Sequence, residues 1–278
     1  MVKAQRVVLV PGTSVDTAIR AMLRGCTVQV VGNLEVLARR TGTAEHVHQA
    51  RVGLRRTRTV LREFGGLSSA VDPAWSDAFG EVFRSLGTSR DLDVVVSRWA
   101  GAVAAAGAPP VAVTRRAGDE PAVVARQALD APALHAVLDY VAAPPIESGE
   151  TIEVATAKRL DRLHRRVARD ARDFASASVA EHHATRKRVK RLRYTAELTS
   201  SLFRPRRVRR FLDTLEPAQA ALGELNDLSV AEAYFRARVE EHPTAWFAVG
   251  WLVAQEPAMV EACVRPLRDA AAAEPYWT

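Results

Sequence analysis

Residues 46–65, HVHQARVGLRRTRTVLREFG, combine a dense positive charge with the apolar spacing of a helix. Five arginines and two histidines lie between His46 and Arg62, while apolar residues recur three and four positions apart. Like charges four positions apart weaken a helix by roughly 0.2–0.5 kcal/mol per pair, and a purely structural helix would interleave glutamates. Here Glu63 comes only at the end. A solvated basic face would be the simpler interpretation if this run stood alone.

A second run, HHATRKRVKRLRYTAELTSSLF at residues 182–203, repeats the first one. A shift of 135 positions pairs His48 with His183, Arg51 with Arg186, Arg55 with Lys190, Arg56 with Arg191 and Arg58 with Arg193. Further along, LGTSRDLDVV (86–95) matches LGELNDLSVA (222–231) with one residue of slippage. Two matched segments at nearly constant separation indicate a duplicated helical unit about the size of a four-helix bundle.

The charged residues of each run share one side of the predicted helix. At about 100° per residue, the cationic positions of the first run fall within an arc of about 80°. This first stripe comprises His48, Arg51, Arg55, Arg58 and Arg62. The second stripe comprises His183, Arg186, Lys190 and Arg193, with Lys187 and Tyr194 on its flank. Two halves related by a pseudo-two-fold axis would bring both stripes toward a common groove. Arginine binds phosphate oxygens bidentately and lysine acts as a mobile point charge, so the stripes predict a polyanion with regularly spaced phosphates.

Neighbouring arginines provide further candidate phosphate contacts. These are Arg162, Arg166 and Arg169 on one side of the helix expected over 159–172, and Arg207 and Arg210 in RPRRVRR (204–210). Between positions 158 and 210 there are 18 Lys and Arg against 5 Asp and Glu, although the whole chain carries a net charge of only +7. The positive charge is therefore local and the rest of the chain is mildly acidic, which favours an anionic partner.

The 278 residues are 48% hydrophobic and 26% charged, the composition of an ordered globular protein. Cys26 and Cys263 fit no metal-ligand spacing and are expected to be thiols in a reducing compartment. The N-terminus has no signal-peptide pattern, and the apolar run 245–254 is too short to span a bilayer. We therefore expect a soluble, cytoplasmic protein without a membrane partner.

Apolar residues recur at helical spacings and alternation is nearly absent, which predicts an all-α protein. Residues 1–13 form an N-terminal extension, and a linker at 143–150 divides the remainder into two bundle-like halves, about 14–144 and 145–278. Ser14 or Asp16 is expected to cap the first helix. Helices are predicted up to about residue 40, then at 44–65, 72–86 and 90–103, in pieces up to 143, and at 151–176, 180–203, 205–222, 226–241 and 244–274, the last broken around Pro257.

The segments HQARVGLRRTRTVL, LGTSRDLDV, HHATRKRVKRLRYTAEL and LGELNDLSV resemble the CHAD family, the conserved-histidine α-helical domain, over roughly residues 14–270. The resemblance implies a duplicated helical-bundle fold that binds inorganic polyphosphate in a basic central groove or pore. It also implies association with polyphosphate granules and no enzymatic activity. The family's binding roles carry over to the positions that match its motif, which are His48, Arg51, Arg55, Arg58, His183, Arg186, Lys187, Lys190, Arg193 and Tyr194.

We add Arg56, Arg62 and Arg191 to the predicted polyphosphate-binding residues, and we expect no cofactor. The first copy departs from the second at Val52 and Thr59, where the second has Lys187 and Tyr194. The first copy is therefore expected to make fewer contacts.

Other chemistries have less support. The histidines of His46–His48 and of His182–His183 are two and one positions apart, so on a helix they do not face one metal ion; packing at the helix start stays open as their role. Of the carboxylates at 91 and 93, only Asp91 recurs, as Asp227. We interpret both as structural, either as helix caps or as ion-pair partners that orient the motif arginines. No nucleotide-binding glycine motif occurs.

Two alternatives stay open beside polyphosphate binding. The local positive charge also suits a nucleic-acid backbone, although aromatic residues, on which single strands stack, make up only 6% of the chain. Within the stripes Tyr194 is the one aromatic candidate. A polyphosphate-processing enzyme is the other alternative, and it would release phosphate. Polyphosphate binding without chemistry ranks first, and nucleic-acid binding ranks second.

Overall fold

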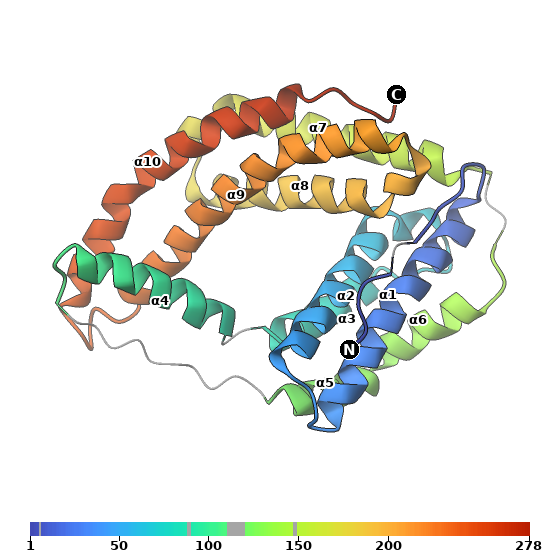
Figure 1. The fold of residues 1–278 in the computed structure, drawn as a ribbon, viewed down its shortest axis with the longest axis horizontal. Coiled ribbons are helices and arrows are strands. Elements are labelled where there is room, and N and C mark those ends of the chain that lie inside the picture. Colours follow the sequence, from blue (N-terminus) through green and yellow to red (C-terminus); the bar gives the residue numbers. More distant parts are fainter. Residues whose placement is uncertain (6, 88–89, 110–119, 147–148) are drawn as a thin grey trace.

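The computed structural model describes residues 1–5, 7–87, 90–109, 120–146 and 149–278, of which 90–94 are described by their backbone alone (Figure 1). These residues form ten α-helices and no strand, which confirms the predicted all-α class. The α-helices are α1 (Val15–Ala38), α2 (Ala44–Glu63), α3 (Trp75–Ser85), α4 (Arg90–Ala105), α5 (Pro121–Leu129), α6 (Pro132–Ala142), α7 (Ile152–Asp173), α8 (Val179–Leu198), α9 (Pro205–Arg236) and α10 (Ala245–Ala272). Short 3₁₀ turns follow three of them, η1 (Gly65–Leu67), η2 (Phe174–Ser176) and η3 (Ser200–Leu202).

The two motif helices, α2 and α8, begin with capping boxes. At α8 the Ser178 amide donates to the Glu181 carboxylate at 2.7 Å, and the Ser178 hydroxyl accepts from the Glu181 amide. At α2 the Thr43 amide donates to Nδ1 of His46 at 3.1 Å, so an imidazole replaces the usual carboxylate. Ser14 caps α1 through its hydroxyl, as predicted. The starts of these helices are therefore encoded locally.

The order of elements supports the predicted duplication. Helices α2 and α8 are both 20 residues long and begin 135 positions apart, and the 3₁₀ turns η1 and η3 that follow them are offset by the same 135 positions. The relation of the two halves by a pseudo-two-fold axis stays a prediction.

Two hydrophobic cores lie on either side of the molecule. The N-terminal core is built by α1, α2, α3, α5 and α6, and the C-terminal core by α7 to α10. The two packing units interlock, because α4 contributes Val96 and Val103 to the C-terminal core, while Ile152 and Ala155 of α7 belong to the N-terminal core. Figure 1 shows α4 beside the far ends of α9 and α10, away from α1.

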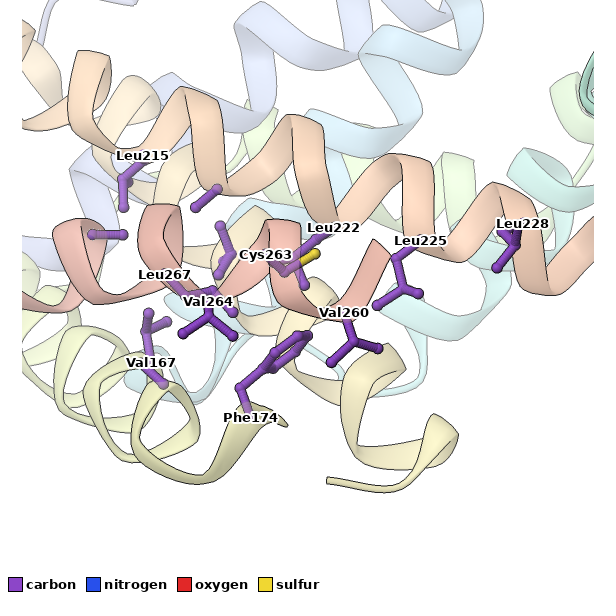
Figure 2. Close-up of a cluster of buried hydrophobic side chains, with 14 of the residues drawn as sticks. Val167, Phe174, Leu215, Leu222, Leu225, Leu228, Val260, Cys263, Val264 and Leu267 are labelled. Atoms are coloured by element: carbon purple, nitrogen blue, oxygen red, sulfur yellow. The ribbon is translucent and has the colours of Figure 1, made fainter. Parts of the chain in front are cut away.

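Helices α9 and α10 are continuous, and the two predicted breaks were wrong. Leu222, Leu225 and Leu228 continue one buried face of α9 across the expected gap at 223–225, and they face α10 residues such as Val260 and Cys263 (Figure 2). Pro257 lies inside α10 without ending it. The contacts between α9 and α10 along their whole length outweigh the low helix propensity of the residues at the expected breaks. Tertiary packing often has this effect.

By length and composition alone, α10 could cross a membrane, and it is the one helix of the described ranges with that property. A core helix of a soluble protein satisfies the same criterion. Ala245, Val249 and Leu252 at its start are buried in the C-terminal core, as predicted for 245–254, whereas Trp246 and Phe247 are exposed. Helix α10 therefore packs as a core helix along α9 and α7.

The N-terminal extension lies against both halves. Val2 and Asn33 of α1 exchange two hydrogen bonds, of 3.3 and 2.7 Å, and Leu9 exchanges two with the hydroxyl of Ser201 in η3, of 2.8 and 3.2 Å. Leu9 is buried in the N-terminal core. The extension thus ties α1 to the turn after α8.

A buried carboxylate fixes the start of α1. Asp16 accepts hydrogen bonds from the hydroxyls of Ser68 and Tyr140 at 2.6 Å each, from Arg20 at 2.7 Å and from the backbone amide of Ile146 at 2.8 Å. Burial alone would raise the pKa of Asp16, but these bonds outweigh it and lower the pKa to about 2. The network joins α1 to η1, α6 and the segment that leads into the second half.

Candidate functional site

Helix α2, which carries the first stripe, approaches α8, which carries the second (Figure 1). Nη1 of Arg55 donates a hydrogen bond to the Tyr194 hydroxyl at 3.1 Å, and its guanidinium lies 5.4 Å from the centre of the Tyr194 ring. The two residues line a cleft, named here the α2–α8 cleft, together with Val52, Arg56, Thr59, Glu197 and Leu198. Arg55 of the first stripe therefore faces α8, the helix that carries the second stripe.

Lys190 adds a second cation from α8. Burial, together with the positive charges of Arg186 and Arg55, lowers the pKa of Lys190 to about 8, and Asp227 opposes this effect. Among the described residues, no carboxylate forms an ion pair with Arg55 or Lys190. Two like charges are held together without a counter-ion of their own, an arrangement that an external anion stabilises.

An aromatic platform beneath the first stripe was not predicted. The ring of Phe83 on α3 lies under three guanidinium groups, at 4.9 Å from Arg51, 5.8 Å from Arg55 and 5.9 Å from Arg58. Such contacts contribute roughly 0.5–1 kcal/mol each at exposed positions. Phe83 therefore partly offsets the mutual repulsion of the stripe and restricts the orientations of its side chains.

Two glycines complete this platform. A Cβ atom on Gly80 would come within 3.0 Å of Arg58, and one on Gly87 within 2.6 Å of Arg51. The missing side chains let both guanidinium groups lie flat against the backbone. Burial and the charge of Arg62 lower the pKa of Arg58. In the sequence, Gly87 was recognised only as part of a repeated motif. Its contact with Arg51 could not be predicted, because the two residues are 36 positions apart.

Glu63 clamps the two halves together. Its carboxylate is almost fully buried and pairs with Nε of Arg191 on α8 at 2.7 Å and with Nε of Arg159 on α7. Arg191, predicted as a phosphate contact, is thus occupied by a structural ion pair across the interface. Because Glu63 ends α2 and its partners belong to α7 and α8, the clamp sets the spacing of the two stripes.

Several other predicted residues also have protein partners. Arg56 donates to the Gln29 side chain at 3.4 Å and to the Gln5 carbonyl at 2.9 Å. Arg62 donates to the Ser76 hydroxyl at 2.9 Å and pairs with Asp77 at 3.3 Å. Arg193 pairs with Glu197 of the cleft at 2.8 Å. These three arginines therefore already have partners within the protein.

The four motif histidines divide into two roles. His46 caps α2, and His182 is buried, where its Nε2 donates to the Phe174 carbonyl at 2.9 Å. Both therefore serve the helix start, the alternative that the sequence left open. His48 and His183 are exposed on the stripes. Nδ1 of His183 lies 3.1 Å from the Asn226 side-chain oxygen, and burial followed by the charge of Lys187 lowers its pKa.

The remaining candidates lie at the edges of this arrangement or outside it. Lys187 is exposed beside the second stripe. Arg162, Arg166 and Arg169 are exposed on α7, and Arg207 and Arg210 on the first turns of α9; the contacts of the described residues do not join these five to the α2–α8 cleft. The Asp91 side chain falls outside the described residues. The charge of Asp227 acts on Arg186 and Lys190 and partly opposes the lowering of both pKa values by burial.

Comparison with known protein families gives a match over most of the chain. The model of the CHAD domain matches residues 21–236, which include α2, α8 and all of α9. The chain belongs to the CHAD family. The match to this CHAD domain thus covers both motif helices, in agreement with the resemblance found from the repeated segments. A search of curated proteins gave no match.

Solved structures share the fold of this CHAD domain. A crystal structure of the CHAD domain from the plant Ricinus communis matches with a TM-score of 0.72 and 24% identity, covering 99% of this chain and 97% of that chain. PptA from Streptomyces chartreusis matches with a TM-score of 0.60 and 20% identity, covering 93% of this chain and 99% of that chain. Similarities at these identities establish the fold, whereas the function has to be argued from the site.

Proposed function

We propose that this CHAD domain binds inorganic polyphosphate through the α2–α8 cleft and the two cationic stripes beside it. The supporting observation is the pair Arg55 and Lys190. They come from different helices, the charge of Arg55 helps to lower the pKa of Lys190, and neither forms an ion pair with a carboxylate among the described residues. A polyphosphate chain carries negative charge at every repeat, so one chain can contact both stripes at once. A single small anion would use only a few of these cations.

Binding is proposed without catalysis, metal or cofactor. The cleft presents arginine, lysine and tyrosine side chains, which bind and orient phosphate oxygens. Incubation of the purified protein with polyphosphate and Mg²⁺ is therefore expected to release no phosphate. Turnover that disappears in Asp91→Asn would show that the protein is a processing enzyme instead.

Nucleic acid is the competing ligand, because phosphate backbones also bind cationic surfaces. The test is displacement of labelled RNA or DNA by long-chain polyphosphate at matched phosphate concentration and salt. Polyphosphate is expected to displace either nucleic acid. If it does not, nucleic-acid binding becomes the better proposal.

The cellular proposal is a cytoplasmic protein at polyphosphate granules. A fluorescent fusion is expected to co-localise with stained granules, and Arg55→Glu is expected to spread it through the cytoplasm. If the wild-type fusion does not co-localise with the granules although the purified protein binds polyphosphate, the proposed location is wrong and the proposed binding is unaffected.

A further inference from the structure

A pocket between α8 and α9 is unexplained by polyphosphate binding. Its volume is about 540 Å³, within the range of roughly 300–1,000 Å³ typical of small-molecule sites. Its walls are mainly aliphatic, formed by Val179, Ala180, Leu222, Leu225, Val230 and Ala233. Inorganic polyphosphate has no apolar part, so it gains nothing from contact with such walls.

Polar groups at this pocket are few and are suited to hydrogen bonding. Asn226 and Ser229 of α9 line it together with His183 of α8, and the His183–Asn226 contact lies at its wall. These residues offer an amide, a hydroxyl and an imidazole. Each already has a protein partner, since the Ser229 hydroxyl donates to the Leu225 carbonyl at 3.1 Å and His183 contacts Asn226. Their remaining donors and acceptors suit the polar edge of a heterocycle better than an aliphatic ligand.

Arg186 brings a desolvated positive charge to the same pocket. Its Nε atom is buried and has no hydrogen-bond partner among the described residues, and burial lowers the pKa of this guanidinium. A buried donor without a partner is unfavourable, and an anion that accepts from it removes this penalty. The pocket is therefore complementary to a ligand that is both apolar and anionic.

The second stripe leads away from this pocket. Lys190 follows Arg186 by one helical turn, and Lys187 is exposed next to it, so neighbouring cations can receive successive phosphates. We propose that the pocket binds the organic group of a nucleoside oligophosphate, with the base between α8 and α9 and the phosphates on Arg186, Lys187 and Lys190. The inference rests on the proposed function in one respect, since both use the phosphate affinity of the α8 stripe.

The test compares ATP with inorganic tripolyphosphate by calorimetric titration of the full chain without divalent metal, at one pH and one salt concentration. Both ligands carry three phosphates, but tripolyphosphate has more negative charge, so electrostatics alone favours it. The proposal predicts that ATP binds about tenfold more tightly, because part of the adenosine surface becomes buried. Equal or weaker binding of ATP, with long-chain polyphosphate still bound, would overturn the nucleotide pocket and leave the proposed function standing. Absence of binding by all three ligands would overturn both.

A pocket-filling variant locates the effect. Ala233 is exposed at the rim, so Ala233→Phe occupies the pocket at low risk to the fold. It is expected to abolish the preference for ATP and to leave the tripolyphosphate Kd unchanged; Ala180→Phe, on the opposite wall, should act in the same way. Ala220→Phe, at an exposed position of α9 outside the pocket, is the matched control and should retain the preference. The proposal would be refuted if both filling variants still bound ATP more tightly than tripolyphosphate. It would also be refuted if the pocket bound decanoate instead of ATP and Ala233→Phe abolished that binding.

Discussion

Arg55 on α2 donates a hydrogen bond to the Tyr194 hydroxyl on α8 at 3.1 Å, across a sequence separation of 139 residues. This contact places the first stripe opposite the second, with Lys190 one turn before Tyr194. The phenol oxygen is an uncharged partner, so the guanidinium keeps its full charge for a ligand. Under the proposed function, one polyanion would lie between these two helices.

Charge reversal at the cleft is expected to weaken polyphosphate binding strongly. Arg55→Glu or Lys190→Glu should reduce the affinity by about tenfold to a hundredfold, because a charge-assisted hydrogen bond contributes roughly 1.5–3 kcal/mol. Arg115 and Arg116 lie outside the described residues and therefore do not serve as controls. Arg268→Glu, at an exposed position of α10, is the control instead. Equal losses at all three positions would indicate diffuse electrostatics.

Polyphosphate affinity should depend on pH through Lys190. The charged form binds phosphate, and this lysine loses its proton as the pH rises through its lowered pKa of about 8. Affinity is therefore expected to change little between about pH 7 and pH 8 and to fall above it, by up to about tenfold per pH unit. Lys190→Arg keeps the charge at all these pH values and should remove the dependence in the same titrations. A wild-type affinity that is constant from pH 7 to about 9.5 would contradict this role of Lys190.

The aromatic platform can be tested by changing Phe83. Phe83→Leu keeps an apolar side chain but removes the ring, so the three guanidinium groups lose a contact each. We expect polyphosphate binding to weaken by about three- to tenfold, given roughly 0.5–1 kcal/mol per cation–π contact. Phe83→Tyr keeps the ring and should bind like the wild type. If the two variants lose the same affinity, packing rather than the ring is responsible.

Glu63→Gln is expected to destabilise the fold. It removes the carboxylate that holds Arg159 and Arg191, and the partly exposed arginines moderate the loss to about 2 kcal/mol in the free energy of unfolding. The matched control is Glu197→Gln, which removes an exposed pair within α8 and should cost less than about 0.5 kcal/mol. Urea denaturation measures both. Similar losses would mean that the clamp has no special role.

Acid should destabilise the protein through Asp16. The folded state lowers the pKa of this carboxyl from 3.8 to about 2, so its stabilising contribution is complete above about pH 4 and is lost as the pH falls toward 2. The shift corresponds to about 2 kcal/mol at neutral pH. Thermal unfolding of Asp16→Asn should therefore show a lower Tm at pH 7 and a smaller further decrease toward pH 2. A parallel decrease in both proteins would refute this assignment.

The fold was predictable where local signals and packing agree. The cap at Ser14 and the apolar spacing of three and four predicted α1, α2 and α8 to within about five residues. The predicted gap within α9 failed because Leu222 and Leu228 pack against α10, and no local window contains that contact. The packing of α4 in the C-terminal core could not be predicted either, because it depends on contacts with α9 and α10.

The stripes were predictable because repetition at one helical phase marks residues that share a face. The sequence did not reveal which cations are occupied. Arg191 belongs to the stripe pattern, yet Glu63 holds it, and the two residues are 128 positions apart. Phe83 likewise looks like an ordinary core residue until the structure places three arginines over its ring. The spacing of Thr43 and His46 was a local signal for a cap and could have been used.

The most direct test is the stoichiometry of binding to polyphosphate of one defined, short chain length, measured by calorimetric titration. One chain per protein is predicted, with Arg55→Ala and Lys190→Ala each lowering the affinity while the stoichiometry stays at one. Two independent chains per protein, with each variant abolishing only one of them, would contradict a shared cleft.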